Sequence, residues 1–197
     1  MSVKFPLVVI SGPAGVGKTT VVKALLKIYP KLRPTVTYTT RQKRVKSTED
    51  KIMHYVSIEE FERRRDNNEF LEWALVHGDY YGTHKVETEE LLQNYPVILN
   101  IDVQGAKQVK QLFEDRVVTI FLLPESHEQI VDHIIKRGEM TEGSFQERLR
   151  SAEHELSHQD YFDYMIVNHE GKLNETIDQI TAILRPRLIA LIGSLDI

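Results

Sequence analysis

The clearest chemical signature in the sequence lies near the N-terminus, where glycines precede a lysine and a threonine. The segment Gly12–Thr19, GPAGVGKT, fits the pattern G-x-x-x-x-G-K-[ST] at every fixed position. Glycines let backbone N–H groups curl around an anion without clashes from Cβ atoms. Lys18 can reach the β- and γ-phosphates of a nucleoside triphosphate, and the Thr19 hydroxyl can ligate Mg²⁺. We therefore expect a nucleoside triphosphate to bind at Gly12, Pro13, Ala14, Gly15, Val16, Gly17, Lys18, Thr19 and Thr20.

The segments on either side of this loop are those that a phosphate-binding loop (P-loop) requires. The apolar run Phe5–Ser11 predicts a buried strand. After the loop, apolar residues repeat with helical period from Val21 to Tyr29, and Pro30 ends that helix. The N-terminus of a helix behind the loop adds partial positive charge. This context favours phosphate binding over a purely structural glycine turn.

Strand-like and helix-like segments alternate along the rest of the chain. Strands are expected at Thr35–Tyr38, Phe70–His77, Tyr80–Tyr81, Val97–Ile101, Val117–Leu123 and Tyr164–Val167, with Gly78–Asp79 as a turn. Helices are expected at Glu59–Asn67, Val86–Leu92, Ala106–Phe113, His127–Lys136, Ser144–His158 and from Leu173 onward. Repeated strand–helix units predict a parallel sheet covered by helices on both faces. The polar stretch Arg41–Met53 predicts a loop within a small inserted subdomain at about 41–81.

Composition limits the classes of protein that remain. The chain has 197 residues, which suits one compact domain. Its 25 Lys and Arg against 29 Asp and Glu give a net charge of -4, so no global basic field indicates a nucleic-acid partner. The absence of cysteine excludes disulfides, thiolate nucleophiles and cysteine-ligated zinc. No apolar stretch approaches the roughly 18 residues needed to span a bilayer, so we expect a soluble, cytoplasmic protein without a membrane partner.

Several further motifs follow the P-loop in a fixed order, and together they resemble those of the guanylate kinase family. They are Thr39–Arg44, Glu69–Ala74, Gly78–Thr83, Ile101–Ala106, Arg137–Gly138, Arg148–Leu149 and Val167–Asn168, and the resemblance covers about 5–185. It implies an α/β fold with a P-loop NTPase-type parallel sheet flanked by helices, a small inserted GMP-binding subdomain and a lid. Within a single domain over 1–197, it implies a core at 1–34, 84–136 and 159–197, a GMP-binding region at about 35–83 and a lid at about 137–158.

The same resemblance implies that the protein transfers the γ-phosphoryl group of ATP to GMP and dGMP, with Mg²⁺ as cofactor, as a monomer or a homodimer. Arg41 and Arg44 would grip the GMP phosphate with the Tyr81 hydroxyl, and Arg137 and Arg148 would close over the ATP phosphates. Guanidinium groups match phosphate oxygens bidentately, which lysine cannot do. The acceptor phosphate, with a second pKa of about 6, needs no general base near pH 7. The expected catalytic residues are Lys18, Arg44, Arg137 and Arg148.

Guanine selection rests, by this resemblance, mainly on Glu72. Guanine presents N1–H and N2–H₂ side by side, and an ionised carboxylate offers two acceptor oxygens and no donor. Thr37 and Thr83 match hydroxyl positions that contact the base in the family. Asp102 follows a strand at the edge where open α/β sheets bind ligands, and it either touches the base or holds Mg²⁺ through water. Asn168 matches a family residue near the adenine of ATP.

The chain departs from the family pattern on the acceptor side. Lys46–Ser47 stands where the family usually has Gly-Glu, and Ile52–Met53 stands where it has Asp-Tyr. The missing tyrosine would donate a hydroxyl to the GMP phosphate, so either His54 or Tyr55 compensates or GMP binds more weakly. Asn100 stands where the family tends to have an acidic residue, which leaves the Mg²⁺ arrangement open.

One short pattern points to a different chemistry. The segment His154–His158, HELSH, matches the H-E-x-x-H helix of zinc metalloproteases. No Gly-x-x-His follows it, and the segment lies in the helix after the lid, where the kinase resemblance needs no metal. A solvated helix face is therefore the favoured interpretation.

Two other functions remain open at this point. One is a catalytically silent guanylate-kinase-like interaction module, although such modules tend to have eroded P-loops and this chain keeps Lys18 and Thr19. The other is a P-loop kinase with a different nucleotide acceptor, which the altered loop Val45–Met53 keeps open.

Overall fold

The fold is organised around a parallel sheet, as the repeated strand–helix units predict. The computed structural model describes residues 5–43, 53–135 and 142–192. In these ranges the larger sheet has five parallel strands, in the order β2 (Arg33–Pro34), β7 (Val97–Asn100), β1 (Leu7–Ser11), β8 (Val117–Pro124) and β9 (Tyr164–Asn168). The central strand β1 is buried along its whole length, because both of its faces are covered.

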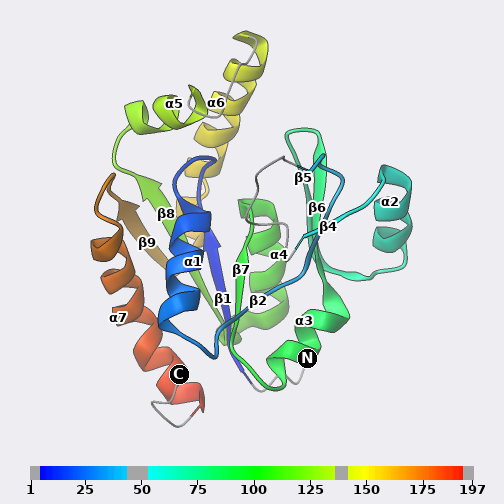
Figure 1. Ribbon diagram of the computed structural model, residues 1–197, viewed down its shortest axis with the longest axis vertical. Coiled ribbons are helices and arrows are strands. Elements are labelled where there is room, and N and C mark those ends of the chain that lie inside the picture. Colours follow the sequence, from blue (N-terminus) through cyan, green and yellow to red (C-terminus); the bar gives the residue numbers. More distant parts are fainter. Residues whose placement is uncertain (1–4, 44–52, 136–141, 193–197) are drawn as a thin grey trace.

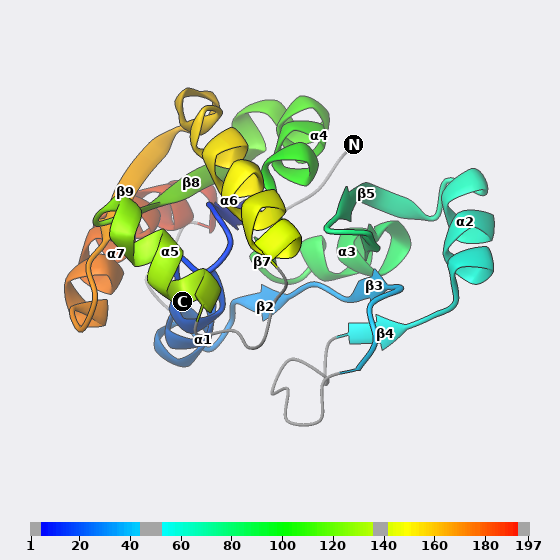
Figure 2. The same ribbon diagram turned by 90° about the horizontal axis from the view of Figure 1, so that it is seen from above.

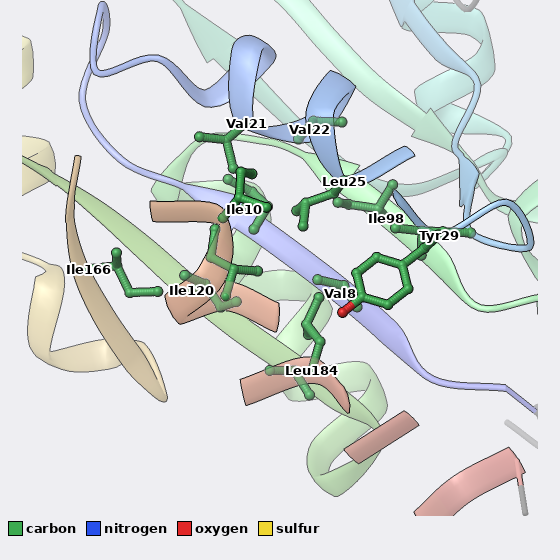
Figure 3. Packing of buried hydrophobic residues seen from close by; sticks show 14 of the residues in the cluster. Val8, Ile10, Val21, Val22, Leu25, Tyr29, Ile98, Ile120, Ile166 and Leu184 are labelled. Atoms are coloured by element: carbon green, nitrogen blue, oxygen red, sulfur yellow. The ribbon is translucent and has the colours of Figure 1, made fainter. Parts of the chain in front are cut away.

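Two pairs of helices cover the two faces of this sheet. The pairs are α1 (Lys18–Ile28) with α7 (Leu173–Ile192), and α3 (Lys85–Leu92) with α4 (Val103–Phe113) (Figure 1). Successive side chains of a strand point to opposite faces. Ile10 of β1 therefore joins a buried cluster with Val21 and Leu184 (Figure 3), whereas Val9 joins a second cluster with Val109. The end of β1 is fixed from both sides at the point where the P-loop begins.

A second, smaller sheet lies beside the first (Figure 2). Its strands are, in order, β4 (Met53–Tyr55), β3 (Thr37–Thr39), β6 (Asp79–His84) and β5 (Phe70–Val76). Helix α2 (Ile58–Asp66) packs on it through Phe61, which is fully buried and stacks on Phe70 with ring centroids 4.5 Å apart. The small sheet thus has its own aromatic core, separate from the two clusters of the large sheet.

Two helices lie above the P-loop end of the large sheet in Figure 1, α5 (His127–Ile135) and α6 (Glu142–Leu156). They pack on each other through Ile130, Ile134 and Ala152. Short 3₁₀ turns at Glu114–Arg116 and Gln159–Tyr161 precede β8 and β9. In the described part of the chain, none of the helices has the length and apolar character to cross a membrane.

The predicted order of strands and helices is confirmed, with three differences. The two-residue β2 was not expected, and β4 replaces the end of the predicted loop, with Tyr55 paired to Thr39 of β3. Strands of two or three residues are too short to show an alternation of apolar and polar residues in the sequence. They form because a neighbouring strand supplies their hydrogen-bond partners. The turn predicted at Gly78–Asp79 lies one residue earlier, since His77 and Gly78 take positive φ angles of 51° and 84° and Asp79 already belongs to β6.

Candidate active site

A cleft of about 280 Å³ lies between the P-loop, the small sheet and α6. The residues that follow β7 form its floor at the carboxyl edge of the large sheet, where open α/β sheets bind ligands. Nine residues expected from the sequence line it: Ala14, Lys18, Thr19, Thr37, Arg41, Glu72, Tyr81, Asp102 and Arg148. Arg44 and Arg137, together with the altered positions Lys46, Ser47 and Ile52, lie outside the described residues. The fold therefore brings the predicted donor-side, acceptor-side and lid residues around one space.

The P-loop has the backbone conformation of an anion cradle. Gly12, Gly15 and Gly17 have φ angles of 139°, 89° and 95°. Gly17 is the N-cap of α1, in the left-handed region that favours glycine. The Lys18 ammonium donates hydrogen bonds to the carbonyl oxygens of Gly12 and Pro13, the latter at 3.1 Å. The lysine charge is thus held over the loop where a phosphate would lie.

The other predicted P-loop residues differ in their surroundings. Val16 is buried in the core beside β1, whereas Thr20 is exposed on α1 and does not line the cleft. The Thr19 hydroxyl accepts a hydrogen bond from Asn100 Nδ2 at 3.3 Å. Asn100, at the position where the family tends to have an acid, therefore contacts the residue expected to ligate Mg²⁺.

Glu72 is the most deeply buried ionisable group of the cleft, with 4% of its surface exposed. The Thr83 hydroxyl donates a hydrogen bond to Glu72 Oε1 at 2.5 Å and fixes the carboxylate. Burial raises the pKa of Glu72 to about 7, and the charge of Asp102 adds to this, while the Thr83 hydrogen bond opposes it. A Cβ atom at Gly105 would collide with Glu72 Oε2. Gly105, to which the sequence analysis gave no role, is therefore needed for the carboxylate to lie here.

Asp102 combines a structural contact with a place in the cleft. It is the N-cap of α4, and its Oδ1 accepts a hydrogen bond from the Gly105 backbone N–H at 2.9 Å. Burial raises the pKa of Asp102, against the lowering effects of the Gly105 N–H and the Lys18 charge. The Asp102 carboxylate thus interacts with two charged groups. The Lys18 ammonium lowers the pKa of Asp102, and Asp102 in turn raises the pKa of Glu72.

Arg41 is aimed into the cleft by the end of β3. Its backbone N–H donates to Thr39 Oγ1 at 3.1 Å, and its Nη2 lies 3.5 Å from the Tyr55 hydroxyl and 3.8 Å from Met53 Sδ. Tyr81 of β6 is paired with Thr39 and lines the same side of the cleft. Of the two alternatives raised by the missing family tyrosine, Tyr55 lies beside Arg41, whereas His54 is exposed and stacks on Tyr38.

Helix α6 presents two charged residues to the cleft, Arg148 and Glu155. They are two helical turns apart and so share one face of the helix. Glu155 is 7% exposed and accepts a hydrogen bond from Ser151 Oγ at 3.3 Å. Glu155 was not expected in the cleft, because in the sequence it falls within the H-E-x-x-H match. Its seven-residue spacing from Arg148 was the available signal.

The two histidines of the H-E-x-x-H segment lie next to each other at the end of α6, with ring centroids 4.6 Å apart. His154 is exposed, whereas Glu155, the second residue of the segment, is buried against the cleft. His158 Nδ1 lies 2.8 Å from the backbone oxygen of His154, which is an ordinary helix-end contact. Across the described ranges, no group of three His, Cys, Asp or Glu side chains could hold a metal ion.

Asn168, at the end of β9, is turned toward the P-loop. Its Nδ2 donates a hydrogen bond to the backbone oxygen of Val16 at 2.7 Å. Its Oδ1 accepts one from the Thr176 hydroxyl at 2.8 Å. The side chain thus contacts the loop itself, and a contact with adenine stays a prediction.

Comparison with known proteins decides the family. A model of the family described as guanylate kinase matches residues 4–187, nearly the whole chain. The chain belongs to the guanylate kinase family. It is 37% identical over 178 residues to a guanylate kinase of Bartonella henselae, covering 90% of this chain and 79% of that relative. It is 41% identical over 179 residues to a guanylate kinase of Clostridium tetani, covering 90% and 84%.

Solved structures agree with this assignment to the guanylate kinase family. A crystal structure of guanylate kinase from Anaplasma phagocytophilum matches with a TM-score of 0.74 and 32% identity, over 96% of this chain and 88% of that one. A shikimate kinase from Acinetobacter baumannii matches with a TM-score of 0.50 and 17% identity, over 93% and 96%. The second likeness shows the fold alone, a P-loop α/β fold shared beyond the guanylate kinases.

Proposed function

We propose that the protein transfers the γ-phosphoryl group of ATP to GMP, and to dGMP, to give ADP and the nucleoside diphosphate. Family membership supports the reaction, and one observation of the chain's own structure carries it. One cleft has the P-loop Lys18 on one side and the buried carboxylate of Glu72 on the other. A donor triphosphate on the loop and a base against the carboxylate would then have their phosphates directed toward the same space.

Guanine recognition follows from the hydrogen-bonding capacity of Glu72. Because Thr83 already donates to Oε1, the carboxylate is fixed and its remaining acceptor sites are available to the N1–H and N2–H₂ of guanine. Adenine has an unprotonated N1 in that place and would set a lone pair against the carboxylate. Thr37 lines the same wall and is the second hydroxyl proposed to contact the base.

The acceptor phosphate is held, in this proposal, by Arg41, Tyr81 and Arg44, with the Tyr55 hydroxyl beside Arg41. The migrating phosphoryl group is stabilised by Lys18 and Arg148, joined by Arg137. The acceptor is a phosphate that is largely dianionic near pH 7, so the chain supplies charge neutralisation, alignment and exclusion of water rather than a general base.

The donor set suits Mg²⁺, which the reaction of this family implies. The Thr19 hydroxyl and the Asp102 carboxylate offer oxygen atoms as metal ligands on the P-loop side of the cleft. Mg²⁺ usually keeps several waters and takes one or two protein oxygens together with substrate phosphates, so two such residues are enough. Bound there, the ion would neutralise phosphate charge. A cytoplasmic location and a monomeric or homodimeric state remain predictions from the sequence.

A coupled assay of ADP release with GMP, dGMP, AMP, CMP and UMP tests the proposal. GMP and dGMP should support turnover, and the kcat/KM values for AMP, CMP and UMP should be far lower. A faster reaction with AMP, CMP or UMP would assign the protein to a different acceptor. ATP binding without turnover on any of the five would instead indicate a silent interaction module.

A further inference from the structure

Asn168 joins the P-loop to two elements that lie outside the cleft. Besides the contact with Val16 and the contact with Thr176 of α7, its backbone oxygen accepts a hydrogen bond from Gln129 Nε2 of α5 at 3.3 Å. Thr176 and Gln129 are buried, with 1% and 8% of their surfaces exposed. The P-loop, α7 and the first of the two helices above it therefore meet at one asparagine.

The contact with Val16 controls the orientation of a peptide group inside the P-loop. The carbonyl of Val16 and the N–H of Gly17 belong to one planar trans peptide unit and point in opposite directions. Because Asn168 Nδ2 holds that carbonyl at 2.7 Å, the Gly17 N–H is directed away from Asn168. Backbone N–H groups of this loop are the donors that bind phosphate. A hydrogen bond behind the loop thus sets the direction of a donor in front of it.

Two further features hold the asparagine in this orientation. The Val16 carbonyl can only accept, so it requires the NH₂ end of the amide, and the Thr176 hydroxyl then donates to the oxygen end. A Cβ atom at Gly17 would lie 2.6 Å from Asn168 Nδ2, so only a glycine leaves room for the amide. Gly17, Asn168 and Thr176 are therefore matched to one another.

We propose that Asn168 and Thr176 are positioning residues for the donor nucleotide, which fix the Val16–Gly17 peptide in its phosphate-binding orientation. This inference rests on the proposed use of ATP as donor and is independent of the identity of the acceptor. Thr176 lies in the first turn of α7, does not line the cleft and acts only through Asn168.

Thr176→Val is the direct test, because it removes the hydroxyl while keeping the shape of the side chain. Loss of one hydrogen bond in this chain of contacts should raise the Kd for MgATP, measured by calorimetry without GMP, by roughly three- to tenfold. The KM for GMP should stay within about twofold, and Thr176→Ser should restore tight MgATP binding because it keeps the hydroxyl. Asn168→Asp places an acceptor against the Val16 carbonyl and should weaken MgATP binding further.

Thr88→Val is the matched control. Thr88 is fully buried and donates its hydroxyl to the His84 backbone oxygen at 2.6 Å, without contact with the P-loop. Its replacement should lower Tm and leave the Kd for MgATP unchanged. If Thr176→Val lowers Tm in the same way and also leaves that Kd unchanged, its role is only structural and the proposal is overturned. Because MgATP binding is measured alone, a failure of the GMP assignment would not alter this result.

Discussion

The two sides of the cleft are built by different means. On the donor side, the P-loop follows a strand that is buried along its whole length, and its proposed binding groups are backbone N–H groups and one lysine. On the acceptor side, the small sheet brings single side chains together from separate strands, as with Glu72 of β5 and Thr83 of β6. The donor side depends on backbone conformation, and the acceptor side depends on pairs of side chains.

This difference indicates where each kind of selectivity resides. A loop of backbone donors binds the phosphates that all nucleotides share, so it cannot select a base. A buried carboxylate fixed by a hydroxyl distinguishes the donors and acceptors of one base from those of another. Variants on the two sides should therefore fail in different ways. Donor-side variants should lose turnover, and acceptor-side variants should lose mainly kcat/KM for GMP.

Lys18→Ala should have the largest effect. The lysine charge is needed on the transferring phosphate and not in a core, so kcat should fall by roughly a hundredfold or more with the fold intact. A coupled ADP assay and circular dichroism measure the two together. Lys27→Ala, exposed at the far end of the same helix, is the control and should keep full activity. Retention of more than about a tenth of the rate by Lys18→Ala would remove the P-loop lysine from the mechanism.

Gly105→Ala should damage mainly the acceptor side. The added Cβ would collide with Glu72 Oε2 and lie 3.3 Å from Asp102 Oδ1, so the Glu72 carboxylate must shift. Overpacking of this kind typically costs about 1–3 kcal/mol, and kcat/KM for GMP should fall by about tenfold or more. The Kd for MgATP should change much less, because the clash with Glu72 Oε2 is closer than the contact with Asp102. Equal losses for GMP and MgATP would show that the two sides are not separable in this way.

Glu72 should also lower the stability of the free protein above neutral pH. Its carboxyl ionises near 4.5 when unfolded but near 7 when folded, so the folded state binds more protons between these values. The contribution of Glu72 to stability therefore falls as pH rises from 4.5 to 7. Glu72→Gln should be more stable than the parent by about 1 kcal/mol at pH 8, because it removes a buried charge from a functional site. Urea unfolding at pH 8 and pH 5 checks this, and an equal difference at both pH values would contradict it.

The donor side could be predicted from the sequence more completely than the acceptor side. The conformation of the P-loop could be predicted because its glycines and lysine are close together in the sequence, and the strand and helix around it repeat with clear periods. Nucleotide binding by its nine residues stays a prediction. The strand β4 was missed because three residues, Met53–Tyr55, carry no period and are ordered by pairing with β3. A pattern in consecutive residues predicts local structure, but it does not predict which segments far apart in the sequence will pair.

Acceptor-side details show why the rest could not be predicted. Gly105 lies within a motif that the sequence analysis singled out, but its role depends on where the Glu72 carboxylate lies in space. The place of Tyr55 beside Arg41 depends on the pairing of β4 with β3. Thr176 carries no motif at all, and only its contact with Asn168 connects it to the P-loop.

Glu72→Gln, assayed for kcat/KM with GMP, tests most directly the central claim that a fixed, buried carboxylate reads guanine. The change keeps the size of the side chain but sets an NH₂ against a guanine donor, so kcat/KM for GMP should fall at least about tenfold. AMP should not become a good substrate, and the Kd for MgATP should stay the same. Glu69→Gln is the control, because Glu69 pairs with Arg64 at 2.7 Å outside the cleft. An unchanged kcat/KM for GMP in Glu72→Gln would show that Glu72 does not read the base.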